Sequence, residues 1–156
     1  MKTPAEFAAT VKWERRDAAF IGGRYSRAHT WHFDGGAIVP GSSSPHSVPL
    51  PFSDAEAVDP EEAFVAALSS CHMLFFLGFA AKRHWLIDSY VDDAIGMMER
   101  DTHGRLSLTR VILRPRIEFA GEMPAQTDID DLHREAHEEC YLANSVKTEI
   151  VVEPQI

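Results

Sequence analysis

The feature that most constrains the fold is a run of 19 residues without a charged side chain, from Ala63 to Ala81. This length is at the lower limit for a helix that spans a bilayer. Polar residues at 69–72 interrupt its middle, and it is the only predominantly apolar run of this length in the chain. A helix that is apolar on nearly every side is otherwise buried in a core or in an oligomer interface. We therefore expect a buried core helix shared by a dimer, and no membrane span.

The ends of this helix carry clear signals. In "DPEE", Asp59 suits the N-cap, Pro60 the first helical position and Glu62 the N3 position of a capping box. Basic residues up to Arg83 suit the last turn, where they face the negative end of the helix dipole. The pattern predicts a central helix over residues 60–83.

The segments before this helix predict a small β-meander followed by a loop. Short runs rich in β-branched and aromatic residues, separated by glycine-containing turns, predict N-terminal strands within residues 9–40. Gly22 and Gly23 suggest a hairpin turn between the first two strands. Residues 41–58 are rich in serine and proline and predict an irregular loop.

The segments after the helix predict a hairpin, a second helix and a last strand. Strands are expected over residues 89–119, with "DTHG" at 101–104 as the turn. A helix beginning near Thr127 is expected over residues 127–140, and a C-terminal strand over 147–154. This order predicts one α+β domain over residues 1–156 with mainly antiparallel pairing.

Composition narrows the function classes. The formal charge is −9, from 24 acidic and 15 basic residues, and no basic stripe is present, so nucleic acid is a poor candidate partner. The start of the chain lacks the apolar segment of a secretory signal, so a cytoplasmic location is the default expectation. Two cysteines without a CxxC spacing do not form a secreted disulfide framework.

The two cysteines, Cys71 and Cys140, are open to several interpretations. A free cysteine is most often a small buried hydrophobe. A metal site is an alternative, because His133, His137 and Cys140 share one face of the second helix, and Cys71 or His72 could complete the four ligands of structural zinc. A third interpretation is thiol chemistry.

A resemblance to a known protein family supports the third interpretation, thiol chemistry at the two cysteines. The stretch "DPEEAFVAALSSCHML" resembles the helix signature of the OsmC/Ohr family, the osmotically inducible protein C and organic hydroperoxide resistance proteins. The stretch "LHREAHEECYLANSVKTEIVVEP" resembles the family's second cysteine-bearing helix and last strand. The resemblance extends from about Val11 onward and is that of a divergent branch, since Tyr141 stands where members often have proline.

The resemblance implies a fold, a reaction and a set of residues. The fold would be an OsmC-like domain, with antiparallel sheets packed around a long buried helix in an intertwined homodimer. The activity would be a cysteine-based peroxidase that reduces organic hydroperoxides without a bound cofactor, recycled by an external dithiol of the lipoyl type. Cys71 would be the peroxidatic cysteine and Cys140 the resolving one, and the two would form an intramolecular disulfide.

The same resemblance implies a catalytic arginine held by Glu61. Strand alignment favours Arg15 for this role, and Arg27 is the next choice. Glu61 precedes Cys71 by ten residues on one helix, which is about 15 Å along its axis. If both residues serve one site, Glu61 should come from the partner subunit's helix or act through a long arginine.

Overall fold

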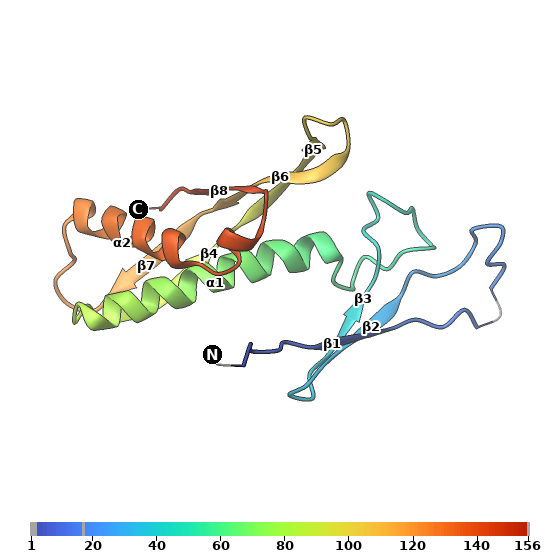
Figure 1. Cartoon of the computed structure of the whole chain (residues 1–156), viewed down its shortest axis with the longest axis horizontal. Coiled ribbons are helices and arrows are strands. Elements are labelled where there is room, and N and C mark those ends of the chain that lie inside the picture. The colour runs from blue at the N-terminus through green and yellow to red at the C-terminus, as the bar shows by residue number, and fades with distance from the viewer. Residues whose placement is uncertain (1–2, 17, 156) are drawn as a thin grey trace. The chain divides into compact units, whose positions relative to one another are not determined.

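The computed structural model describes residues 3–16 and 18–155 and has the predicted α+β composition (Figure 1). Its contacts divide the chain into two compact units, residues 1–63 and 64–156. The division falls just inside the long helix.

The first unit contains the predicted antiparallel meander. Strands β1 (Ala9–Lys12), β2 (His29–Phe33) and β3 (Ile38–Gly41) pair in the order β1-β2-β3. The predicted hairpin between the first two strands is confirmed: Gly22 and Gly23 lie in the turn of its long connection, between Ala19 and Arg24, which form an antiparallel bridge. That connection is held by an aromatic cluster in which the ring centroids of Trp13, Phe20 and Tyr25 lie 4.8–5.7 Å apart.

Helix α1 (Pro60–Lys82) begins with the predicted capping box. The backbone N–H of Glu62 donates to Asp59 Oδ1 at 2.8 Å, and the backbone N–H of Asp59 donates to Glu62 Oε2 at 3.3 Å. These reciprocal bonds satisfy donors that the first turn would otherwise leave free. The helix therefore starts where the sequence predicts.

Within the chain, α1 buries one stripe. Its buried residues are Leu68, His72, Phe76 and Ala80, spaced four apart. The opposite side is open to solvent, and Leu74 on that side is 63% exposed. In length and composition alone, α1 meets the requirements of a membrane-spanning helix. The core helices of soluble proteins often meet the same requirements.

The predicted hairpin is a bent one made of four strands. Strand β4 (Ile87–Asp92) pairs with β7 (Pro115–Phe119), and β5 (Ile95–Arg100) pairs with β6 (Leu106–Leu113), both antiparallel. The bend is fixed by the backbone N–H of Arg114, which donates to Asp92 Oδ1. Strand β8 (Glu149–Val152) adds to β6 in parallel, a departure from the mainly antiparallel pattern.

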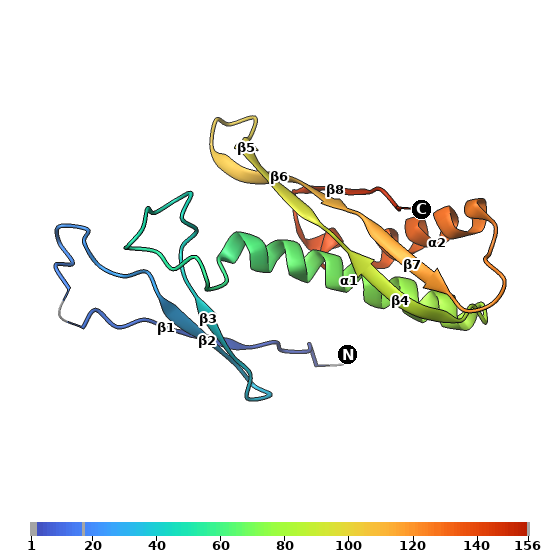
Figure 2. The same cartoon turned by 180° about the vertical axis from the view of Figure 1, so that it is seen from behind.

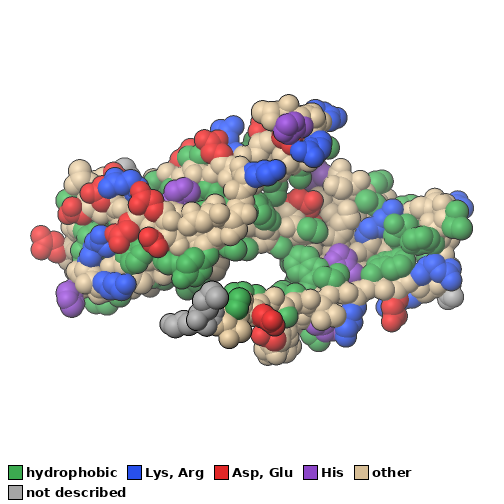
Figure 3. Space-filling view, viewed as in Figure 1, with side chains coloured by type: hydrophobic (Ala, Val, Ile, Leu, Met, Phe, Trp, Pro, Cys, Tyr) green, Lys and Arg blue, Asp and Glu red, His purple; other side chains and the backbone are tan. Residues whose placement is uncertain are grey.

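The second helix α2 (Gln126–Glu139) lies with α1 over one face of these strands (Figures 1 and 2). It begins one residue before Thr127, with Ala125 at the N-cap, and Cys140 is its C-cap residue. A short 3-10 turn, η1 (Ala143–Ser145), leads into β8. Charged side chains gather on the outer face of α2 (Figure 3).

Two apolar clusters hold the second unit together. The first joins α1 and α2 to β4 and β7 around Phe76 and Leu132, both completely buried. The second joins α1 to β6 and β8 around Leu68, Val111 and Leu113. Val111 and Leu113 are two residues apart on β6, so their side chains lie on the same face of the strand, and both are buried. Cys71 and Cys140 lie on the helices between these clusters.

Candidate active site

The two cysteines are brought together although 69 positions separate them in the sequence. Cys71 is half-buried on α1, Cys140 is buried at the end of α2, and both are free thiols. Their side chains lie close enough for Cys71 to contribute to the raised pKa of Cys140. Helix α2 therefore ends with its cysteine directly against the middle of α1.

Burial raises the pKa of the Cys140 thiol to about 11, and the nearby Cys71 side chain adds to the rise. The backbone N–H of Ala143, 3.4 Å from Cys140 Sγ, opposes the rise only partly. Cys140 is therefore a protonated thiol at neutral pH. Because the thiolate is the nucleophilic form, Cys140 is poorly suited to attack first.

Tyr141 follows Cys140, and its ring packs against Phe75 of α1. The two rings meet edge to face, with centroids 4.9 Å apart. The N–H of Cys140 bonds to the carbonyl of His137 at 3.3 Å, so the cysteine caps the helix while its neighbour contacts α1. The aromatic contact thus anchors the chain directly after the second thiol.

Beside the thiols, two buried histidines face each other. His72 of α1 and His133 of α2 are 1% and 4% exposed, and their rings stack with an interplanar angle of 5°. Their facing nitrogens, His72 Nε2 and His133 Nδ1, lie 3.0 Å apart. Burial lowers the pKa of His72 to about 3 and of His133 to about 4, so both rings are neutral at pH 7.

This arrangement does not favour the zinc alternative. His133 points to His72 instead of joining His137 and Cys140 around a common point. Among residues 3–16 and 18–155, no group of three or more His, Cys, Asp or Glu side chains is arranged to hold a metal ion.

Two of the residues predicted for the site line one pocket of the first unit. Arg27 and Glu61 both face a pocket of about 560 Å³, whose other walls include Trp13, Phe20 and Tyr25. Arg27 is held in place: its Nη1 donates to the carbonyls of Gly23 at 2.9 Å and Tyr25 at 2.6 Å. Its guanidinium also lies over the Tyr25 ring, 3.7 Å from the centroid. A fixed cation and a carboxylate thus share a pocket that has aromatic side chains in its wall.

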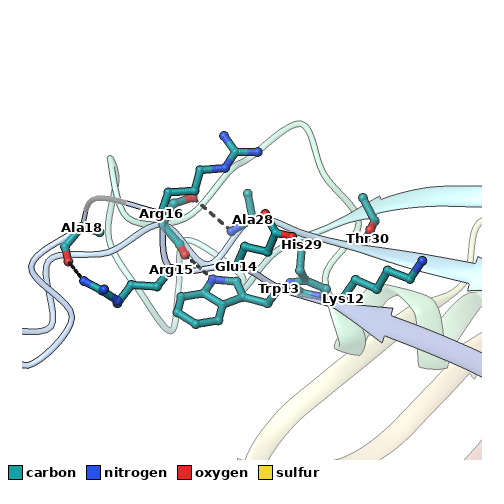
Figure 4. A pocket seen from close by; sticks show the side chains of 10 residues that line it. Lys12, Trp13, Glu14, Arg15, Arg16, Ala18, Ala28, His29 and Thr30 are labelled. Atoms are coloured by element: carbon teal, nitrogen blue, oxygen red, sulfur yellow. Dashed lines mark hydrogen bonds between the residues drawn. The ribbon is translucent and has the colours of Figure 1, made fainter.

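Arg15 lies elsewhere in the same unit. It lines a separate pocket of about 480 Å³, and its Nη1 donates to the carbonyl of Ala18 at 3.4 Å (Figure 4). Glu61 does not line that pocket. Of the two arginines that the sequence suggests, Arg27 is the one that shares a pocket with Glu61.

The histidine pair is the feature that sequence reasoning missed. From the sequence, the spacing of His133 from His137 and Cys140 suggests a metal site instead. The available signal was His72 itself, an ionisable residue in the middle of an uncharged helix, which must find a buried partner. The sequence could not show that the partner is His133, 61 positions away.

Comparisons with known proteins identify the family and the fold of this chain. A sequence model described as OsmC-like protein matches residues 53–155. An OsmC-like protein of unknown function from Vibrio cholerae has 51% sequence identity and a TM-score of 0.95, with 97% of this chain and 100% of that chain covered. No curated protein sequence matches the chain.

More distant solved structures show the same fold. The organic hydroperoxide resistance protein OhrB of Bacillus subtilis has 18% identity and a TM-score of 0.64, with 96% of this chain and 98% of that chain covered. An organic hydroperoxide resistance protein from Legionella pneumophila has 14% identity and a TM-score of 0.71, with coverages of 99% and 100%. At these identities the likeness concerns the fold alone. With the family match over most of its length and the Vibrio relative over nearly all of it, the chain belongs to the OsmC-like protein family.

Proposed function

We propose that this protein is a thiol-dependent peroxidase that reduces organic hydroperoxides through Cys71 and Cys140. The observation that carries the proposal is the contact between the two thiols, one half-buried and one buried and protonated. That asymmetry suits an attacking cysteine and a resolving cysteine. The names of the structural relatives in Bacillus and Legionella support the same substrate class.

The reaction balances in two steps. The Cys71 thiolate attacks the terminal oxygen of the hydroperoxide, the O–O bond breaks, and the alkoxide leaves as an alcohol after taking a proton. Cys71 is then a sulfenic acid. The Cys140 thiol attacks its sulfur, an S–S bond forms, and the hydroxyl leaves with the thiol proton as water. An external dithiol, of the lipoyl type by family resemblance, returns both cysteines to thiols.

We assign the supporting cation to Arg27, ahead of Arg15. A guanidinium near a thiol favours its thiolate form and can donate to a peroxide oxygen. Arg27 is supported by its shared pocket with Glu61 and by the two carbonyls and the aromatic ring that hold it. The aromatic walls of that pocket suit the apolar group of an organic hydroperoxide.

A homodimer completes the proposal. Leu74 and small residues leave an apolar face of α1 exposed, and all of β1 is exposed in the single chain. Glu61 lies about 15 Å along α1 from Cys71 on the same chain, which is beyond the reach of a carboxylate. We infer that each site combines Cys71 of one subunit with Arg27 and Glu61 of the other.

The test is direct. One equivalent of cumene hydroperoxide added to the reduced protein should convert both thiols into one intramolecular disulfide, seen by peptide mass spectrometry. Cys71→Ser should not consume the hydroperoxide. Cys140→Ser should consume one equivalent and leave a sulfenic acid that dimedone traps. Two free thiols after treatment of the unmodified protein would refute the proposal.

The dimeric site has its own test. Sedimentation should give twice the chain mass. Mixing inactive Cys71→Ser chains with inactive Arg27→Ala chains should restore part of the activity, because one site of the mixed dimer then holds both intact partners. A monomer, or mixed dimers without activity, would contradict the shared site.

A further inference from the structure

The buried contact between His72 and His133 joins the same two helices that bring the thiols together. His72 directly follows Cys71 on α1, and His133 precedes Cys140 by seven residues, about two turns of α2. The proposed reaction uses neither histidine. Their contact is nevertheless the buried polar link between the two cysteine-bearing helices.

The chemistry of this contact is directional. Each neutral imidazole has one N–H donor and one acceptor nitrogen, so the 3.0 Å contact requires one ring to donate and the other to accept. A pair that carried a proton on every nitrogen would have two donors facing each other and no hydrogen bond. Of the groups around the pair, His137 disfavours a charge on His72, whereas Asp130 slightly favours one on His133. Tyr90 of β4 packs against the same cluster as Phe76, whose ring centroid lies 4.3 Å from that of His133, and Cys71 directly precedes His72.

The other contacts between α1 and α2 depend less on the orientation of the two helices than the His72–His133 hydrogen bond does. The packing of Phe76 and Ala80 against Leu132 and Ala136 is apolar, and apolar burial depends little on direction. The ion pair between Arg83 and Glu135, at 2.6 Å, is exposed near the end of α1. A buried hydrogen bond requires a particular distance and angle. The His72–His133 contact is therefore the more directional of these links.

We propose that the His72–His133 hydrogen bond is a positioning element that fixes α2 against α1 so that Cys140 stays beside Cys71. The inference rests on the proposed function for its biological meaning, since a resolving thiol must meet the sulfenic acid before a second oxidant does. The positioning itself is measurable without any hydroperoxide. His72 and His133 are therefore positioning residues that act through the helices.

The experiment measures how readily the two thiols form a disulfide at equilibrium. In a glutathione buffer, oxidised glutathione and the protein dithiol give the protein disulfide and two reduced glutathiones, with two electrons transferred. The equilibrium constant is the effective concentration of one thiol at the other. His72→Leu and His133→Leu should lower the equilibrium constant about tenfold, because each removes the buried directional hydrogen bond and replaces the imidazole with an apolar side chain.

Two matched variants separate positioning from general stability. His72→Gln keeps a donor at the place of Nε2 and should retain the equilibrium constant of the unmodified protein. Ile129→Ala removes apolar packing from the same face of α2 and should lower stability without lowering the constant. Equal constants in His72→Leu and the unmodified protein would overturn the inference, as would an equal loss in Ile129→Ala.

A measurement on the unmodified protein covers the case in which the leucine variants do not fold. Nitrogen-15 NMR of labelled histidines at pH 6.5 should show two neutral rings joined by one N–H···N bond in both the reduced and the oxidised protein. Rings that exchange freely with solvent would overturn the inference. If cumene hydroperoxide leaves the thiols intact but the glutathione constants follow the predicted order, the proposed function fails while the positioning role stands.

Discussion

The buried histidine pair should make the protein sensitive to mild acid. In an unfolded chain both histidines have an ordinary pKa near 6.5, whereas burial in the fold lowers the pKa of His72 to about 3 and of His133 to about 4. As the pH falls below 6.5, the two histidines bind protons in the unfolded state but stay neutral in the folded state. The two neutral histidines therefore make their full contribution to the free energy of unfolding above pH 6.5. This contribution is lost progressively as the pH falls from 6.5 to about 3 to 4.

The size of the effect follows from the same values. Between pH 7 and pH 5, each histidine should lower the free energy of unfolding by about 2 kcal/mol, so the pair should lower it by about 4 kcal/mol. A typical domain has only about 5–15 kcal/mol of stability in total. The pair alone can thus remove a large part of it over two pH units.

Urea unfolding at fixed protein concentration, at pH 7, 6 and 5, measures this loss. The control is the double variant His72→Gln/His133→Asn, which keeps hydrogen-bonding groups in similar places and cannot be protonated in this range. Its stability should fall by about 4 kcal/mol less than that of the unmodified protein between pH 7 and pH 5. His103→Gln, in the exposed turn between β5 and β6, should behave like the unmodified protein. Parallel losses in the double variant and the unmodified protein would refute the reasoning.

Four further predictions concern single side chains. Arg27→Lys should reduce the rate of hydroperoxide consumption at least about tenfold, because an ammonium cannot reproduce the forked guanidinium geometry, while Arg15→Lys should have little effect; the reverse order in a stopped-flow assay would return the role to Arg15. Asp59→Ala should lower the free energy of unfolding by about 1 kcal/mol through loss of the N-cap, and Asp54→Ala is a nearby control outside the helix. Leu113→Ala should cost about 2–5 kcal/mol, because its side chain is fully buried between α1 and β8, and a smaller loss by denaturant titration would place that core elsewhere. Tyr141→Ala should slow disulfide formation after sulfenic acid appears, whereas unchanged kinetics would show that its contact with Phe75 does not hold the second thiol.

The sequence predicts the elements of this fold well where local chemistry sets them. The start of α1 follows from Asp59 and Glu62 alone, because a capping box is a contact between residues three apart. The internal face of β6 follows from the alternation that places Val111 and Leu113 on one side. Both features depend on neighbours in the sequence.

Features that depend on distant partners were predicted less well. The parallel pairing of β8 with β6 joins Ile150 to Val111, and no local pattern in either strand specifies its direction. The histidine pair is a second case. Helical spacing places His133 on the same face as His137, but it gives no information on the contact with His72, which lies 61 positions away. The choice between Arg15 and Arg27 is a third, since both lie near strand ends and only the pocket relates one of them to Glu61.

The capping box of α1 also matters for the motion of the pocket wall. Glu61 lies between the two residues that cap each other, in the turn of a helix that opens most readily. While the cap is closed, the Glu61 backbone has one conformation and its carboxylate stays at the pocket. With the cap open, the same carboxylate would be spread over many conformations, and its effective local concentration would fall although the residue is unchanged. The bonds between Asp59 and Glu62 thus restrict the backbone of the first turn, and with it the positions that the Glu61 carboxylate can take at the pocket wall.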